Sequence, residues 1–270
     1  MVVQHNLSAM NTNRQLSGVT SSLSKATEKL SSGYKINRAG DDAAGLSISE
    51  KMRSQIRGLN KASDNAQDGI SLIQTAEGAM NEAHAILQRM NELATQAAND
   101  TNTTADRGAI QDEMDQLTSE IDRIYCTTQF NTQNLLDGNF TKKHLQVGSL
   151  ANQSIGISIK SLSASALSIS ALSVSSFSKA GSAMTKIQAA IGSVSRQRSE
   201  LGALQNRLEH TINNLDTTSE NTQAAESRIR DTDIAETMVD YSKNNILSQA
   251  GQSMLAQANQ STQGALSLLG

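Results

Sequence analysis

Residues that could do chemistry are few in this 270-residue chain, and they do not gather in one place. The four histidines stand one on each of four separate segments: His5, His84, His144 and His210. There is no HExxH, no CxxC and no phosphate-cradling glycine loop. His84 lies between two alanines on a long helical stretch, which favours a partly exposed interface residue over a metal ligand.

The other reactive side chains also favour structural roles. Asp112, Glu113 and Asp115 could hold a metal only if they converged, but consecutive helical positions diverge, so a solvated face is expected. Cys126 is the single cysteine, which excludes an intrachain disulfide and a multi-cysteine metal site. We expect Cys126 to fill a buried, small apolar position. The sequence therefore predicts no enzyme, no metal site and no cofactor.

The composition argues against a compact globule and against several kinds of partner. Aromatic residues number six and proline is absent, so large core side chains are scarce and nothing interrupts long helices. The net charge is −3 with lysine and arginine spread along the chain, which makes nucleic acid and membranes poor partners. The opening MVVQHNLSAMNTN lacks the features of a cleavable secretory signal. This predicts a cytoplasmic protein, or one exported by a route that reads no such signal.

Seven-residue spacing marks the long helices that organise the chain. The N-terminal arm repeats Val2, Ala9, Leu16, Leu23 and Leu30, and Ser31-Ser32-Gly33 supplies its stop. The next helix, which we expect to open with a capping box from Ser47 to Glu50, holds the longest pattern. Large residues on one row are followed three positions later by mostly small ones: Met52, Leu59, Ala66, Ile73, Met80, Leu87 and Ala94, then Gln55, Ala62, Gly69, Ala76, Ala83, Met90 and Ala97. Such a pair of rows lets a second helix approach closely.

The middle of the chain turns back on itself. After a polar break at residues 100–104, a helix over residues 110–124 is expected to run antiparallel to its predecessor. Alternating apolar residues predict one β-hairpin near residues 143–160. Residues 161–178 carry no charge and nine serines, which predicts a connecting segment near the outer edge rather than a membrane span. Heptads from Ile187 to Ile229 then predict the returning helix.

The last 27 residues, Asn244 to Gly270, carry no charged side chain. Helical spacing predicts an amphipathic helix there, but its polar positions hold amides and hydroxyls in place of the usual lysine and glutamate. This composition suits a helix surrounded by other protein. A break at residues 231–233, where Asp233 and Glu236 can cap a restart, leaves two terminal arms of matched length, and we expect them to lie side by side. The predicted fold is mainly α: a long-helix coiled coil and helical rod with one small β-hairpin.

Several long blocks resemble the bacterial flagellins, in the right order and over nearly the whole chain. The first half carries LSSGYKINRAGDDAAGLSISEKMRSQIRGL (30–59) and NAQDGISLIQTAEGAMNE (65–82). The second half carries RSELGALQNRLEHTINNL (198–215), AESRIRDTDIAE (225–236) and ILSQAGQSMLAQANQ (246–260). The resemblance implies a structural subunit of the extracellular flagellar filament, which self-assembles into a helical polymer for swimming motility.

The resemblance also implies a domain plan and partners. Residues 1–40 and 232–270 correspond to a terminal coiled-coil filament-core domain, and residues 41–231 to a rod domain with the hairpin. Because the hairpin is followed almost at once by the returning helix, the variable outer domain of many relatives is absent. Flagellins are exported by the flagellar type III apparatus without a cleavable signal, which implies an export chaperone and a filament cap as partners. Thr262 departs from the proline of many relatives, and we expect the last helix to continue through it.

The two arms are the expected polymerisation element. Since a lone uncharged amphipathic helix cannot bury its stripe, we expect residues 1–36 and 234–270 to fray in the free subunit and to order on assembly. The residues predicted to form the polymer core are Leu7, Leu16, Leu23, Leu30, Ile246, Leu247, Met254, Leu255 and Leu268.

The resemblance further implies recognition by Toll-like receptor 5. The block ILQRMNELATQAAND (86–100) matches the family's recognition surface, with Arg89 and Leu93 in place and Glu113 on the next helix. A guanidinium, an aliphatic anchor and a carboxylate could share one surface of two packed helices. The same three residues would also serve as ordinary packing and rod–rod contacts.

Two other functions stay open at this point. A hook–filament junction protein has similar terminal arms, and a generic coiled-coil interaction module would share the heptads. The rod-domain blocks in both halves favour the filament subunit over the junction protein.

Overall fold

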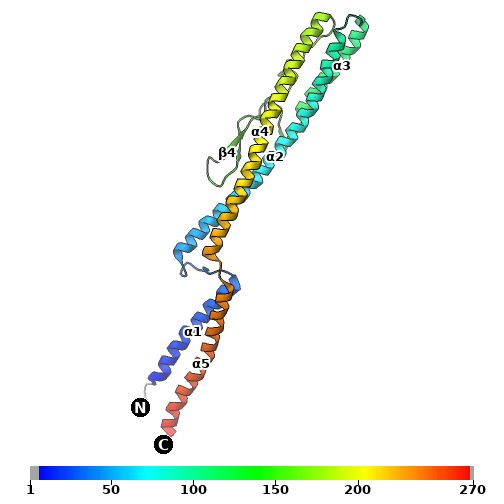
Figure 1. Cartoon of the computed structure of the whole chain (residues 1–270). Coiled ribbons are helices and arrows are strands. Elements are labelled where there is room, and N and C mark those ends of the chain that lie inside the picture. The colour runs from blue at the N-terminus through cyan, green and yellow to red at the C-terminus, as the bar shows by residue number, and fades with distance from the viewer. Residues whose placement is uncertain (1–5, 268–270) are drawn as a thin grey trace. The chain divides into compact units, whose positions relative to one another are not determined.

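The structure, a computed structural model, describes residues 6–267, with side chains described for residues 6–261. This part of the chain folds into long helices and two small antiparallel sheets (Figure 1). In order the elements are α1 (Leu7–Ser32), α2 (Ala43–Ala97), α3 (Thr104–Thr127), β1 (Gln129–Phe130), β2 (Gln133–Asn134), β3 (Lys143–Gln146), β4 (Ser154–Ile157), α4 (Phe177–Arg230) and α5 (Ile234–Ser267). The predicted mainly α fold with a hairpin is confirmed, while the short β1–β2 pair was not predicted.

The chain divides into two compact units. The first comprises Met1–Ile56 with Glu220–Gly270, and the second comprises Arg57–Ser219. Their limits fall inside α2 and α4, whereas the sequence-based domain limits fall at the breaks between helices.

Local hydrogen bonds explain where the helices begin and end. Gly33 ends α1 in the left-handed conformation (φ 76°), and its N–H donates to the Lys29 carbonyl at 2.9 Å, as expected for a glycine stop. The predicted capping box from Ser47 to Glu50 is wrong, because α2 already begins at Ala43. Asp42 provides the acceptor instead: its Oδ1 accepts from the Gly45 N–H at 2.9 Å. Asp233 opens α5 as predicted, since its Oδ1 accepts from the N–H groups of Ala235 and Glu236.

The second unit is built around one apolar core shared by α2, α3 and α4. The large heptad residues of α2 from Leu59 to Ala94 are buried, and so are those of α4 from Ile187 to Leu215. On α3 the buried residues are Ile110, Met114 and Ile121. The small row of α2 from Ala62 to Ala97 is buried as well, which confirms that it faces other helices.

The predicted hairpin is β3–β4, paired with His144 opposite Gly156. It rests on α2 at positions without a side chain. A methyl group at Gly58 would stand 2.7 Å from Ser149 Cβ, and one at Gly69 would meet the Leu145 side chain. Asn65 Nδ2 donates to the Gln146 carbonyl at 3.1 Å. Two glycines and one amide therefore fix the hairpin to the helix.

The serine-rich segment at residues 161–178 is part of the core, which the sequence did not predict. Six of its apolar residues are buried: Leu162, Ala164, Leu167, Ile169, Leu172 and Val174. Helix α3 holds the backbone of this segment, because Asp122 accepts from the Ala164 N–H and Gln111 accepts from the Val174 N–H. The serines separate the apolar residues and let the segment pack without regular secondary structure.

The first unit pairs α1 with α5, as expected for arms lying side by side (Figure 1). Two backbone hydrogen bonds join the segment after α1 to the break between α4 and α5. The Lys35 N–H donates to the Arg230 carbonyl, and the Thr232 N–H donates to the Gly33 carbonyl. The Tyr34 ring lies 4.8 Å from the Arg230 guanidinium and 5.9 Å from that of Arg53. These contacts join the loop after α1 to both neighbouring helices.

Candidate self-assembly interface

The contact between α1 and α5 is lined on its α1 side by the predicted apolar stripe. Leu16, Leu23 and Leu30 are half-buried and Ala26 is buried. The α5 side is small and polar instead. Its least exposed residues recur at heptad spacings: Thr237, Tyr241, Asn244, Ser248, Gly251, Leu255 and Ala258.

Gly251 sets how closely the two helices approach. A methyl group there would stand 3.1 Å from Leu16 Cδ1, so the glycine admits the leucine side chain. At the far end, Asn6 Nδ2 donates to the Ala258 carbonyl at 2.9 Å. The pairing within one chain therefore depends on close approach more than on large apolar residues of α5.

Apart from the half-buried Leu255, the large aliphatic residues of α5 up to residue 261 lie outside this contact. Six of them are 44–67 % exposed: Ile234, Met238, Val239, Ile246, Leu247 and Met254. Val239 and Ile246 are seven residues apart, and so are Leu247 and Met254, so these four form two rows along the helix, while Ile234 and Met238 lie on another side near its start. Part of the predicted polymer core thus faces away from the chain's own arm. We call these six residues the exposed α5 rows.

The other predicted core residues divide between the two environments. Leu16, Leu23, Leu30 and Leu255 are half-buried in the first unit. Leu7 is exposed, as is Met10 beside it on the first turn of α1. Leu268 lies outside the described residues. Sequence reasoning missed Ser248 and Gly251, although a glycine within a long helix is a usable signal of close packing.

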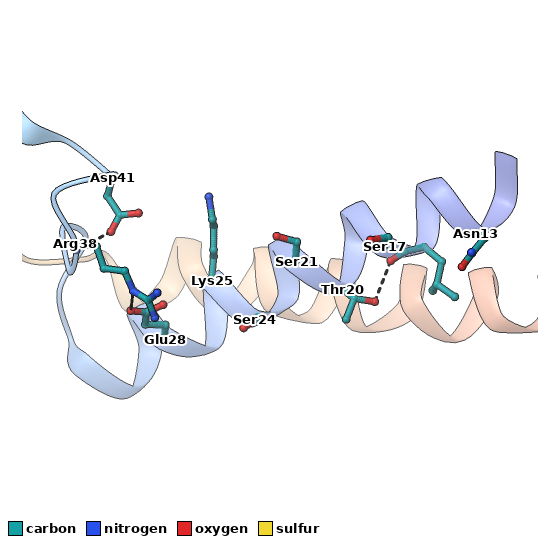
Figure 2. Close-up of a pocket in the computed structure, with 10 residues that line it drawn as sticks. Asn13, Ser17, Thr20, Ser21, Ser24, Lys25, Glu28, Arg38 and Asp41 are labelled. Atoms are coloured by element: carbon teal, nitrogen blue, oxygen red, sulfur yellow. Dashed lines mark hydrogen bonds and ion pairs between the residues drawn. The ribbon is translucent and has the colours of Figure 1, made fainter. Parts of the chain in front are cut away.

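A groove runs along α1 next to this contact (Figure 2). Four of its ten lining residues carry hydroxyl side chains: Ser17, Thr20, Ser21 and Ser24. Its charged end joins α1 to the following loop, where Arg38 Nε lies 2.9 Å from Glu28 Oε1. In the same loop Asp41 accepts hydrogen bonds from the backbone N–H groups of Arg38 and Asn37, which lower the pKa of its carboxyl. The groove therefore carries neutral hydroxyl groups up to Ser24, and its charged end is formed by Lys25 and Glu28 of α1 together with Arg38 and Asp41 of the loop.

The structure brings together two of the three residues of the implied receptor surface. Arg89 on α2 and Glu113 on α3 are exposed and form an ion pair of 3.0 Å, and Arg89 also pairs with Glu92. The hydrogen bond that Arg89 donates to Glu113, and then the one that it donates to Glu92, raises the pKa of Arg89. Leu93 is only 1 % exposed and lies in the core of the second unit, so it is not a surface anchor in the single chain.

The side chains that could bind a metal or act as nucleophiles do not cluster in the described part of the chain. No group of three or more His, Cys, Asp or Glu side chains that could hold a metal occurs among the residues that the structure describes. The expectation of a buried Cys126 is wrong, because this residue lies on the solvent face of α3, one position beyond the half-buried Tyr125. Within residues 6–267, no helix is long and apolar enough to cross a membrane.

Paired terminal helices with two apolar rows left uncovered define a self-associating helical structural subunit. Residues 3–141 match the bacterial flagellin N-terminal helical region, and residues 184–269 match the bacterial flagellin C-terminal helical region. The chain belongs to the bacterial flagellin family, and is accordingly a structural subunit of a filament rather than an enzyme.

Relatives agree over the full length of the chain. It is 55 % identical to a flagellin of Halalkalibacterium halodurans and 50 % identical to a flagellin of Bacillus subtilis. Each alignment covers 100 % of this chain and 100 % of the relative. Among solved structures, a flagellin of Bacillus cereus matches with a TM-score of 0.50 and 31 % identity, over 60 % of this chain and 94 % of that one. Only the hairpin and the serine-rich segment stand between the two matched regions, so this is a short form without a variable outer domain. Flagellins form the bacterial flagellar filament, which lies outside the cell.

Proposed function

We propose that the filament is held together by α1 and α5, with residues 1–40 and 232–270 acting as the filament-core domain and residues 41–231 as the rod domain. The observation that supports this most strongly is the pair of exposed α5 rows. Exposed apolar rows of this length are rare on a monomeric protein and mark an interaction surface.

The rows are large enough to matter energetically. Burying a fully exposed large apolar side chain contributes about 1.5–3 kcal/mol, so covering the half that remains exposed contributes about 1 kcal/mol each. Six residues then supply about 6 kcal/mol per copy, compared with about 8 kcal/mol for a micromolar dissociation constant. The tail carries no charge, and the serine and threonine side chains of the groove are neutral. Arms of several copies can therefore pack together as long as the charged end of the groove, formed by Lys25, Glu28, Arg38 and Asp41, stays outside the contact.

The geometry of the contact favours a fibre. A row on α5 that meets a different surface of the next copy is a head-to-tail contact, and such contacts produce an open helical polymer when the rotation does not close. This is the behaviour that a swimming filament needs.

Polymerisation seeded with filament fragments tests the proposal. The double variant Ile246→Ser with Met254→Ser should keep the helical circular dichroism of the parent and fail to extend seeds. Deletion of residues 244–270 removes most of α5 and its helical signal; it should leave the second unit folded and also abolish growth. Gln252→Ser, an exposed polar change on the same helix, is the matched control and should extend seeds normally. Normal growth of the double variant would refute the role of the rows. Growth of the parent into small rings only would favour the hook–filament junction function.

Export and assembly factors follow from the same exposed surface. We propose that the chain leaves the cell through the flagellar type III apparatus, that an export chaperone covers the α5 rows before export, and that a filament cap guides addition outside. A chaperone acting this way should protect α5 from proteolysis in a mixture of the two proteins, and should not protect α3.

We further propose that the second unit is a ligand of Toll-like receptor 5. The exposed Arg89–Glu113 pair supports this, with Leu93 holding the two helices together from beneath. Arg89→Ala and Glu113→Ala should each weaken binding to the isolated receptor ectodomain by at least tenfold. Arg123→Ala, which removes an exposed pair elsewhere on α3, is the control. Equal binding by all three variants would remove this proposal.

A further inference from the structure

A cavity of about 300 Å³ lies in the second unit where the two small sheets meet α2. Its walls include Leu72 of α2, Ile157 of β4 and two phenylalanines, Phe130 and Phe140. The whole chain has only three phenylalanines, so two of them line one cavity. For scale, an apolar cavity of roughly 150 Å³ is enough to bind benzene. The cavity therefore has room for one aromatic side chain.

The third phenylalanine is exposed. Phe177 is the first residue of α4, and 64 % of its surface is in contact with solvent. Serines flank it at positions 175, 176 and 178, so no apolar neighbour in sequence covers the ring. A large aromatic side chain left in water at the end of a helix is the kind of residue that anchors protein interfaces.

The two features cannot meet within one chain. At the level of the cavity, α2 faces Leu208 of α4: a methyl group at Gly69, which lines the cavity, would stand 3.4 Å from Leu208 Cδ1. Phe177 lies 31 residues earlier on the same continuous helix, which corresponds to about 46 Å at 1.5 Å per residue. Only a second copy can bring a Phe177 side chain to the cavity.

We propose that Phe177 of one copy inserts into the Phe130–Phe140 cavity of the next copy. This inference rests on the proposed self-assembly and names a second contact for it, independent of the terminal arms. The two copies are displaced by about 46 Å along the α4 direction. A protruding side chain that enters a cavity elsewhere on an identical molecule makes a head-to-tail contact, which propagates into a fibre when the rotation between copies does not close.

The proposed contact is apolar, although charged side chains stand near it. Asp68 is an exposed carboxylate at the edge of the cavity. Lys179 is two residues beyond Phe177, on the other side of α4, and its ammonium lies 3.3 Å from Ser175 Oγ. Lys143 also lines the cavity, but its ammonium lies 5.9 Å from the Phe140 ring centre and belongs to that wall.

Seeded growth of the full chain measures the contact. Phe177→Ser should raise the critical concentration for growth about tenfold or more, because most of the ring would no longer be buried on assembly. Phe177→Leu should recover part of the loss. Leu150→Ser removes a side chain of similar exposure, 67 %, from the tip of the β3–β4 hairpin and should leave the critical concentration unchanged. A critical concentration for Phe177→Ser equal to that of the parent would overturn the proposal.

Crosslinking locates the contact directly. In a Cys126→Ser background, Ser176→Cys combined with Gln133→Cys in the cavity wall should give a ladder of covalent oligomers when assembled fibres are treated with a short bismaleimide. Leu150→Cys with Gln133→Cys is the control. A ladder only in the control, or in neither, overturns the proposal.

If the parent extends no seeds at all, the proposed function itself fails. If the parent grows while the ladder and the Phe177 effect are missing, only this inference fails.

Discussion

Replacing Gly58 by alanine should reveal whether the β3–β4 hairpin is seated on α2. Gly58 lies within α2, and a Cβ there would stand 2.7 Å from Ser149 Cβ and 3.3 Å from Ser149 Cα. The second distance involves backbone, so the turn between the strands has to move and no side-chain rotation relieves the contact. Gly78, on the same helix, is the matched control because nothing lies within 4 Å of its Cβ position.

The expected magnitudes come from two opposing effects. Alanine in place of glycine within a helix stabilises by about 1 kcal/mol, and Gly78→Ala should show this gain in full. Gly58→Ala has the same gain and the added cost of overpacking, which is typically about 1–3 kcal/mol. The two variants should therefore differ in free energy of unfolding by about 1–3 kcal/mol, with Gly58→Ala the less stable.

Urea unfolding followed by circular dichroism measures this difference, since a change in midpoint without a change in slope reports stability alone. Limited proteolysis of the folded variants adds a local measurement, because a displaced turn between β3 and β4 should be cut faster. Equal stabilisation by both alanines, with equal cleavage of the turn, would show that the hairpin does not rest on the helix at Gly58.

Four further changes test other parts of the chain. Gly251→Leu should separate α1 from α5, and amide exchange in α1 should accelerate; unchanged exchange would mean that the close approach is unimportant. Thr103→Ala removes one half of a capping box at the start of α3 and should cost about 1 kcal/mol in urea unfolding. Asp41→Asn should remove an acid-sensitive transition of the loop after α1. The pKa of Asp41 is lowered in the folded chain, so its carboxylate stabilises the fold fully at pH values above the ordinary pKa near 4. This stabilisation is lost as the pH falls through the lowered pKa of the folded chain. Amide exchange in that loop can follow the loss. In the free subunit, amides of α1 and α5 should exchange much faster than those of the second unit, and strong protection before assembly would contradict the expected fraying.

Periodicity predicted most of the core correctly. Heptad residues such as Ile73, Leu87 and Leu201 are buried because a long helix that keeps one row apolar has one way to hide it. The start of α2 was misplaced because Asp42 and Ser47 are both good N-caps, and the sequence does not show which one the chain uses. The serine-rich segment was misjudged for a related reason: it has neither helical nor strand period, and its burial depends on Gln111 and Asp122 of α3, far away in sequence.

The arms show a subtler limit of sequence reasoning. Large apolar residues at helical spacing predict that a face of α5 is buried, but not against which partner. In the structure, Ser248 and Gly251 of α5 pack against α1, although hydropathy ranks these small residues low. Ile246 and Met254 stay exposed to solvent. The close approach of the two helix backbones favours small residues at the contact. A pattern of apolar side chains does not mark such residues, so it could not predict this pairing.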